Sequence, residues 1–315
     1  MTDNVRVSVV IPVHDAEAGE SDGEKTVRSA LASDLQELEV LVTDNGSTDR
    51  SGAILANVCD SRVVRVRLHP GRGASRPRNV GIARSRAPYV AFLDPGDLIK
   101  PDKLSAATNA LDRHPEADFA FADFEYLDPG GSVVRPSAIA DFPRFRTLTS
   151  VRVEGDWYLI PQAQLARGLM YESFIETSGV VLRKQLLTEM GPFDESTIYA
   201  GELDLWFRLA HSCSALYWNH VGHSCQHKSE EDLAYEAHAR TDDRITVLQR
   251  EKRRWNDRAA RRQLDRRIAQ DLAAMGYEQR LHRRRLRSIA MFAYAFATYP
   301  DARWLRAMLD SIRSS

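Results

Sequence analysis

Short apolar runs alternate with segments of helical periodicity in the first third of the chain. The runs are rich in β-branched residues, and most of them are apolar at nearly every position, which is typical of parallel strands covered on both faces. They span residues 6–12, 38–43, 63–68 and 89–93, and the segments between them with helical spacing are 24–33, 50–58 and 79–86. This alternation predicts an α/β fold with a doubly wound, mostly parallel sheet.

The middle of the chain has a different pattern, and its last quarter is helical. Residues 118–126 alternate aromatic and other side chains, which predicts a strand, and an apolar strand at 178–183 precedes a short helix at 184–190. Residues 136–170 show no clear periodicity, so we expect a loop-rich wall over the site. Helical periodicity returns at 201–210 and again from residue 230 onward.

Composition places the chain among ordinary globular proteins. Of its 315 residues 43% are hydrophobic and 28% charged. No apolar run approaches the ~18 residues that span a bilayer, and the N-terminus has no signal pattern. The three cysteines have no CxxC spacing, which suits a reducing compartment. We therefore expect a cytoplasmic protein.

The net charge of −1 conceals a strongly basic C-terminal region. Residues 240–315 hold 19 Lys and Arg against nine Asp and Glu, so the preceding residues are acidic overall. Such a region suits an anionic partner, and we expect peripheral contact with the inner face of a membrane, helped by the apolar segment 289–299. The alternatives are that the arginines pair with the acidic body and that this segment forms an interhelical or dimer core. No nucleic-acid partner is expected, and the oligomeric state is left open.

Two carboxylates follow the fourth predicted strand. Asp94 and Asp97 come directly after a continuously apolar run, so they should lie at the carboxyl edge of the sheet, where open α/β folds bind ligands. Paired carboxylates there favour a divalent metal, Mg²⁺ or Mn²⁺, which usually accompanies phosphate groups. The alternative is a plain turn, because Asp-Pro-Gly-Asp is also good β-turn chemistry.

Six segments in order resemble the family-2 glycosyltransferases of GT-A fold, whose sheet is Rossmann-like. The resemblance covers roughly residues 5–225 and rests on 7–15, 43–49, 77–81, 92–97, 191–194 and 201–208. It implies a glycosyltransferase domain over 1–228, with a nucleotide-sugar half at about 1–105 and an acceptor half at about 106–228. A basic helical C-terminal extension over 229–315 follows it.

The resemblance implies a nucleotide-binding set of residues. His14 stands where the family usually has Tyr, and an imidazole can still cover a pyrimidine. Asp44 and Asn45 follow the second strand, where relatives often place two acids, and their oxygens can accept the imide N–H of uracil or thymine. The full set is Pro12, His14, Asp15, Asp44, Asn45, Arg78 and Asp94. Turn and capping chemistry is the alternative for Asp44 and Asn45.

The metal motif departs from the family pattern. Relatives commonly read Asp-x-Asp-Asp, whereas Gly96 occupies the third position here. The resemblance implies Asp97 as the main ligand of Mn²⁺ or Mg²⁺, with Asp94 beside it and His227 as an additional ligand. His223 is the rival to His227, and ordinary polar strand or loop histidines are the alternative to both.

Inversion of the anomeric centre requires one general base to take the proton from the acceptor hydroxyl. The family places this acid at the head of a helix in a Glu-Asp-x-Asp-Leu-Trp pattern. Here Gly201 replaces the first acid and Glu202 falls where the base Asp falls. The resemblance also implies Asp204, Trp206 and Trp157 as acceptor or supporting residues, although core packing is the alternative for the tryptophans.

Together these features predict an inverting glycosyltransferase. It would move a sugar from a UDP- or dTDP-sugar to a hydroxyl of a glycan, lipid-linked or polymer acceptor by metal-assisted single displacement. The alternative is a nucleotide-sugar-binding scaffold or regulatory protein without turnover, which the departures at Gly96 and Gly201 motivate. The sugar, the acceptor and the linkage are not specified by the sequence.

Overall fold

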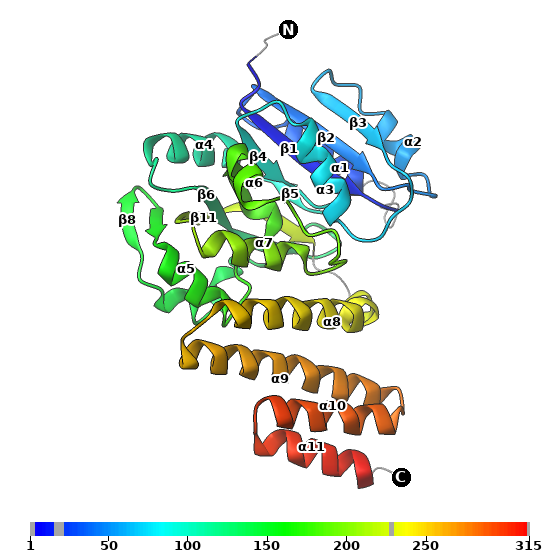
Figure 1. The fold of residues 1–315 in the computed structure, drawn as a ribbon. Helices are drawn as coiled ribbons and strands as arrows, with labels where there is room; N and C mark the ends of the chain where they lie inside the picture. The colour runs from blue at the N-terminus through cyan, green and yellow to red at the C-terminus, as the bar shows by residue number, and fades with distance from the viewer. Residues whose placement is uncertain (1–3, 16–21, 227–229, 314–315) are drawn as a thin grey trace. The chain divides into compact units, whose positions relative to one another are not determined.

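The computed structural model describes residues 4–15, 22–226 and 230–313 (Figure 1). The chain divides into two compact units, Met1–His227 and Lys228–Ser315. Among the described residues, no helix combines the length and the apolarity needed to cross a membrane.

The first unit is built on one 11-stranded sheet. Its strand order is β3-β2-β1-β4-β10-β6-β11-β9-β8, with β5 paired to β11 and β7 paired to β6. Strands β1 to β4 are mutually parallel where they pair, and β6 and β11 are also parallel, whereas β10 runs antiparallel to both of its neighbours. The strands are β1 (Val7–Val13), β2 (Leu38–Asp44), β3 (Val63–Arg67), β4 (Tyr89–Phe92), β5 (Leu98–Ile99), β6 (Phe119–Leu127), β7 (Val133–Arg135), β8 (Val151–Glu154), β9 (Trp157–Ile160), β10 (Val180–Arg183) and β11 (Ala215–Gln226).

Helices cover both faces of this sheet, which explains why β1, β2 and β4 are mostly apolar and are buried at every position. Val9 and Ile11 of β1 belong to a core cluster with residues of α1 and α4, whereas Val10 packs against Gly81 of α3. The helices of this unit are α1 (Asp22–Leu31), α2 (Ser51–Ala56), α3 (Ser75–Arg84), α4 (Lys103–Arg113), α5 (Gln162–Leu169), α6 (Lys184–Met190) and α7 (Gly201–Ala210). The α/β class with a mostly parallel central sheet is therefore confirmed.

The expectation of an irregular wall over residues 136–170 is wrong. This stretch contains two short 3₁₀ helices (Ile139–Asp141 and Phe145–Thr147), the strands β8 and β9, and helix α5. Strands β8 and β9 pair antiparallel around Gly155, and β9 extends the sheet by pairing with β11. Four-residue strands are too short to give a readable periodicity, and β9 is stabilised by pairing with β11, a partner far away in the sequence.

The described part of the second unit is built from helices, as expected. It comprises α8 (Glu230–Arg254), α9 (Arg258–Leu281), α10 (Arg285–Thr298) and α11 (Ala302–Arg313), which pack in chain order as a layered stack (Figure 1). Asp257 caps α9 by accepting hydrogen bonds from the N–H groups of Ala259 and Ala260. The Ser288 hydroxyl in α10 donates to the carbonyl of Gly276 in α9, and the hydroxyls of Ser288 and Ser311 lie 3.1 Å apart, which joins α10 to α11.

Candidate functional site

The chain leaves β4 through a tight turn that carries two carboxylates. The N–H of Asp97 donates to the carbonyl of Asp94 at 3.1 Å, and Gly96 has a φ of 94°. With Pro95 before it, this is the arrangement of a type II turn, whose third position favours glycine because its φ is positive. The positive φ explains why this chain has glycine where the family usually has an acid. The turn also holds Asp94 and Asp97 together at the carboxyl end of β4.

A single hydroxyl connects the two carboxylate-bearing residues. Ser178 Oγ accepts the Asp94 N–H at 3.0 Å and donates to Asp97 Oδ2 at 2.5 Å. Ser178 lies in the 3₁₀ turn Thr177–Gly179 that leads into β10, the strand beside β4. The antiparallel pairing of β10 with β4 thus brings the start of β10 to the end of β4.

Arg78 connects Asp94 to the candidate base. Helix α3 begins at Ser75, four residues before the expected start, so Arg78 lies in its first turn rather than in a loop. Arg78 Nη2 donates to both Asp94 oxygens at 2.7 and 2.8 Å, and Nη1 lies 3.6 Å from Glu202 Oε2. Burial alone would lower the pKa of Arg78, but the neighbouring carboxylates, Asp94 foremost, raise it. A guanidinium with 4% of its side chain exposed is therefore held charged between two acids.

Glu202 lies in the first turn of α7, where the helix dipole favours a carboxylate. A β-carbon at the preceding Gly201 would lie 2.3 Å from Ser75 Oγ and 3.2 Å from Thr197 Oγ1. The heads of α3 and α7 therefore approach too closely for the acid that the family usually has there. Because Gly201 has no side chain, the two helix starts can approach each other, and Arg78 lies beside Glu202.

Glu176 is a fourth acid at this edge that the sequence analysis missed. Burial, followed by the charges of Asp97, Asp94 and Glu202, raises the pKa of Glu176 to about 8, with Arg78 opposing the shift. The same causes, burial and the charge of Asp94, raise the pKa of Asp97 to about 7. Three carboxyl groups thus lie near the Arg78 guanidinium, and Asp97 is joined to one of them, Asp94, through Ser178. The pKa values of Asp97 and Glu176 lie near neutrality.

Asp97 also faces a buried group of potential metal ligands. Ligand atoms of Asp97, His223 and Cys225 all lie within 4.8 Å of one another. His223 is fully buried, and neither of its ring nitrogens has a hydrogen-bond partner among the described residues. Burial and the charges of Lys103 and Lys100 hold the pKa of His223 well below its usual value, so its imidazole is neutral. Lys103 is buried beside it and donates to the carbonyl of Ser178.

These donors fit a divalent cation. A neutral imidazole with two unpartnered nitrogens beside a carboxylate supplies nitrogen and oxygen ligands, which suit Mn²⁺ better than the oxygen-only preference of Mg²⁺. Burial raises the pKa of the Cys225 thiol, which donates to Asp97 and is therefore a poor ligand unless a metal displaces its proton. His227, the predicted additional ligand, lies outside the described residues, whereas its rival His223 lies in this group.

The loops after β1 and β2 are tied to each other. Asp15 Oδ1 accepts the Thr48 N–H at 2.7 Å and the Asp49 N–H at 3.3 Å, and these backbone contacts lower the pKa of Asp15. Asp44 Oδ1 accepts the Ser47 N–H at 2.7 Å, which closes the turn that follows β2. Asp15 and Asp44 therefore shape the loops at the sheet edge through their own hydrogen bonds.

The remaining residues predicted to bind the nucleotide differ in their solvent exposure. Asn45 is buried, and its amide nitrogen donates to the carbonyls of Gly71 and Gly73. Its Oδ1 has no hydrogen-bond partner within the part of the chain that the structure describes. Pro12 is buried in β1, whereas His14 is exposed with its Nε2 3.7 Å from Asp15 Oδ2. Within this predicted set, the His14 ring is the one that can serve as a covering surface for a base.

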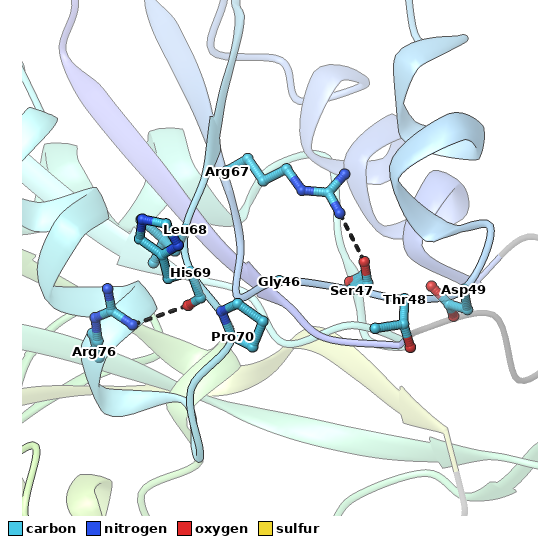
Figure 2. A pocket seen from close by; sticks show the side chains of 9 residues that line it. All are labelled: Gly46, Ser47, Thr48, Asp49, Arg67, Leu68, His69, Pro70 and Arg76. Carbon is cyan, nitrogen blue, oxygen red and sulfur yellow. Dashed lines mark hydrogen bonds between the residues drawn. The ribbon is translucent and has the colours of Figure 1, made fainter.

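A cavity of about 790 Å³ opens at the carboxyl ends of β2 and β3. Figure 2 shows Arg67 donating to the Ser47 carbonyl across one side of it and Arg76 donating to the His69 carbonyl on the other, each at 3.0 Å. Its size is that of a site for a cofactor-sized molecule. It is lined by Gly46, Ser47, Thr48, Asp49, Arg67, Leu68, His69, Pro70 and Arg76.

Three predicted acceptor or supporting residues have structural contacts. Asp204 accepts a hydrogen bond from Arg208 Nε at 2.8 Å, and Arg208 in turn donates to the carbonyls of residues 190–192. Trp206 is 1% exposed and stacks on Phe119. Trp157 is 6% exposed and stacks on Trp218 in the core cluster. The structure therefore places both tryptophans in the core, and Asp204 braces the loop before α7.

A family model described as glycosyl transferase family 2 matches residues 8–187, more than half of the chain. The chain belongs to glycosyl transferase family 2. The match includes β1 to β4, Arg78, Asp94, Asp97 and Glu176, but it ends before Glu202 and His223.

Curated relatives match over shorter stretches. An uncharacterized glycosyltransferase of Haemophilus influenzae is 33% identical over 125 residues, which is 38% of this chain and 49% of that protein. The succinoglycan biosynthesis protein ExoO of Rhizobium meliloti is 31% identical over 125 residues, covering 40% of this chain and 36% of that protein. The chain thus spans about half or less of these relatives' length.

A solved structure extends the comparison to the fold of nearly the whole chain. S. aureus TarS residues 1–349, in a complex with UDP-GlcNAc, superposes with a TM-score of 0.66 at 15% identity. The match covers 98% of this chain and 89% of that one. At this identity the likeness shows the GT-A fold alone.

Proposed function

We propose that this family-2 protein is a metal-dependent, inverting glycosyltransferase that uses a UDP- or dTDP-sugar. The observation that carries the proposal is the convergence of Asp94, Glu176 and Glu202 around Arg78, with Asp97 joined to Asp94 through Ser178, at the carboxyl edge of the sheet. Such a cluster of incompletely neutralised acids suits a cation and a proton acceptor rather than structural support.

Glu202 is the general base in this mechanism. Its carboxylate takes the proton of the acceptor hydroxyl while that oxygen attacks the anomeric carbon from the face opposite the leaving group. The bond between the anomeric carbon and the nucleoside diphosphate breaks in the same step, so the configuration inverts. Arg78 is a positioning residue, because its buried guanidinium holds Glu202 and Asp94 in place.

Asp97 and His223 would hold the divalent metal, with Asp94 beside them. When bound, the metal neutralises the negative charge that develops on the departing diphosphate. Ser178 orients Asp97 through its 2.5 Å hydrogen bond, and the type II turn at Pro95–Gly96 fixes the spacing between the two aspartates.

The nucleotide lies at the ends of β1, β2 and β3 in this proposal. The 790 Å³ cavity provides space there, and Arg67 and Arg76 provide positive charge at its walls. Asp44 and Asn45 border this region, and His14 is the exposed ring of the β1 loop. The neighbour TarS was crystallised with UDP-GlcNAc and with UDP, which supports a uridine nucleotide as the first donor to test.

The acceptor is a hydroxyl of a glycan, lipid-linked or polymer molecule, and ExoO, a succinoglycan biosynthesis protein, supports polysaccharide assembly as the setting. We also propose a cytoplasmic location with peripheral contact between the basic C-terminal unit and a membrane. The alternative function is a nucleotide-sugar-binding scaffold without turnover. The contacts of Gly96 and Gly201 weaken that alternative, because both departures have a packing or backbone cause.

Calorimetric titration with UDP, dTDP, GDP and ADP, each with Mn²⁺ and with EDTA, tests the donor site. We expect one pyrimidine diphosphate to bind only with metal, and Asp97→Asn to weaken that binding by about tenfold or more. Glu116→Gln, an exposed acid in the acceptor half, is the control. The donor assignment fails if the folded protein binds none of the four nucleotides, or if binding is identical in EDTA.

A further inference from the structure

Helix α10 buries one face and leaves an uncharged face uncovered. Phe292 and Ala295 are buried, and Ser288 bonds to the carbonyl of Gly276 in α9. No charged residue occurs between Ser288 and Pro300. Leu286 is 82% exposed, Tyr294 50% and Phe296 37%, and Ala290, Ala293 and Ala297 are exposed as well. A water-facing helix surface normally carries charged side chains, so this surface is unusual for a solvated helix.

Helix α11, which packs on α10, also has exposed apolar side chains on one face. Leu305, Leu309 and Ile312 follow one another at helical spacing and are 40–44% exposed. Trp304, Ala307 and Ser311 form the buried face of the same helix. Two adjacent helices of the C-terminal unit therefore present large apolar side chains that this chain does not cover within its described residues.

Positive charge surrounds these apolar side chains. Residues 280–315 contain eight arginines and two aspartates, with no lysine or glutamate. Four of the arginines are exposed at the start of α10: Arg283, Arg284, Arg285 and Arg287. Asp301 bonds to Arg303, so one of the two acids is already neutralised locally.

A polar cavity joins the α10 face. It has a volume of about 610 Å³ and is lined by Gln249, Lys252, Arg253, Arg261, Asp265, Ile268, Tyr294, Ala297 and Thr298. Tyr294 and Ala297 belong to both the cavity wall and the apolar face of α10. Lys252 pairs with Asp265 at 2.5 Å, whereas Arg253 makes no ion pair with any described residue. The cavity thus offers positive charge directly beside apolar surface.

We infer that α10 and α11 dock on an anionic phospholipid surface, with a lipid phosphate seated in the cavity at Arg253 and Arg261. Apolar side chains beside clustered arginines match an interface in which acyl chains lie next to anionic headgroups. A tyrosine at the boundary between the two suits the same environment. A second copy of the chain is a poorer occupant, because both partners would bring an excess of positive charge. This inference deepens the proposed membrane contact and does not depend on sugar transfer.

Sedimentation with vesicles tests the inference on the full chain. We expect binding to vesicles of phosphatidylcholine mixed with phosphatidylglycerol, little binding to phosphatidylcholine alone, and release at high salt. Arg253→Glu should weaken binding to the mixed vesicles by about tenfold or more, because it reverses a charge at the surface. Leu286→Asp should weaken binding by a similar factor, since it removes an inserted side chain.

Control variants distinguish membrane docking from unfolding and from self-association. Val133→Asp, at a residue 50% exposed in the first unit, should leave vesicle binding unchanged. All variants should keep the parental melting temperature and the parental nucleotide affinity, so a failed donor site would not affect the result. Equal binding to both kinds of vesicle, or none to either, overturns the inference. Vesicle-independent dimers that Leu286→Asp dissociates would instead identify a second copy as the occupant.

Discussion

At the amino ends of the central strands the acid Glu39 has a lowered pKa, whereas at the carboxyl ends Asp97 and Glu176 have raised pKa values. At the amino end of the strands, Glu39 of β2 is 1% exposed and accepts three hydrogen bonds, from Ser8 Oγ, Arg86 N and Arg86 Nε, at 2.7–2.8 Å. Burial alone would raise its pKa, but these donors lower it. At the carboxyl end, burial and neighbouring acids raise the pKa values of Asp97 and Glu176 to about 7 and about 8.

The difference separates structural support from a site held ready for a ligand. A buried carboxylate with its hydrogen bonds satisfied stabilises the fold, whereas a group of acids with one guanidinium among them is unfavourable until a cation arrives. Among the described residues, the acids with raised pKa values, Asp97 and Glu176, lie where β4 and β10 converge with the head of α7. Functional sites are where such unfavourable arrangements are retained.

Replacing Glu202 should give the largest effect and should act on turnover alone. Glu202→Gln keeps the shape but removes the proton acceptor, so we expect turnover to fall by about 10²- to 10⁴-fold. Release of the nucleoside diphosphate from the donor that binds in calorimetry measures it. Glu189→Gln, at an exposed acid of α6, is the control.

The comparison breaks if Glu202→Gln retains full turnover with unchanged nucleotide affinity, because Glu202 would then not be the base. Loss of nucleotide affinity along with turnover would place Glu202 in the donor site instead. Retained affinity with lost turnover would also exclude the scaffold alternative.

Replacing Glu39 should act on stability alone. Glu39→Gln leaves the Ser8 hydroxyl and the Arg86 N–H with a poorer acceptor in a buried position, which we expect to cost about 2 kcal/mol of unfolding free energy. The ion pair contributes little to this figure, because the Arg86 side chain is 66% exposed. Urea unfolding measures the loss, with Glu37→Gln as an exposed neighbouring control. A change in nucleotide affinity would contradict the assignment of this edge to structure.

The parallel half of the fold could be predicted from sequence because β1, β2 and β4 are mostly apolar and buried along their whole length. The β1, β2 and β4 segments were found within one residue or two of their observed ends, and α6 and α7 at their observed bounds. Helix α4 was not anticipated, and β5, β7, β8 and β9 are too short to show a period. The strand β11, which passes through the histidine-rich stretch, pairs parallel with β6 around two register shifts. Non-local pairing of this kind is not encoded in local patterns.

The site was predicted in part. Asp94, Asp97 and Glu202 could be placed because motifs carry them. The structure joins Asp94 to Glu202 through Arg78 and Asp94 to Asp97 through Ser178. Glu176 and Ser178 have no motif around them, and the antiparallel approach of β10 alone places them beside β4. The sequence indicates Glu176 only weakly, in that an acid lies just before the predicted strand 178–183.

Replacing Glu176 should give the smallest effect, but the effect distinguishes most directly between the acids at the two ends of the strands. Its folded pKa of about 8 lies above the ordinary value of 4.5, so between these pH values the folded protein holds a proton that the unfolded chain releases. Stability should therefore fall as pH rises through this window, opposite in sign to the usual contribution of a paired acid such as Glu39. Glu176→Gln removes this term, so in EDTA it should gain at least about 1 kcal/mol of stability relative to the parent between pH 5 and pH 8. Glu116→Gln is the control, because the pKa of Glu116 lies below its usual value and adds no pH dependence of stability in this range.

A Glu176→Gln protein that is less stable than the parent to the same extent at both pH values would mean that Glu176 supports the fold as Glu39 does. The contrast between the two ends of the strands would then fail.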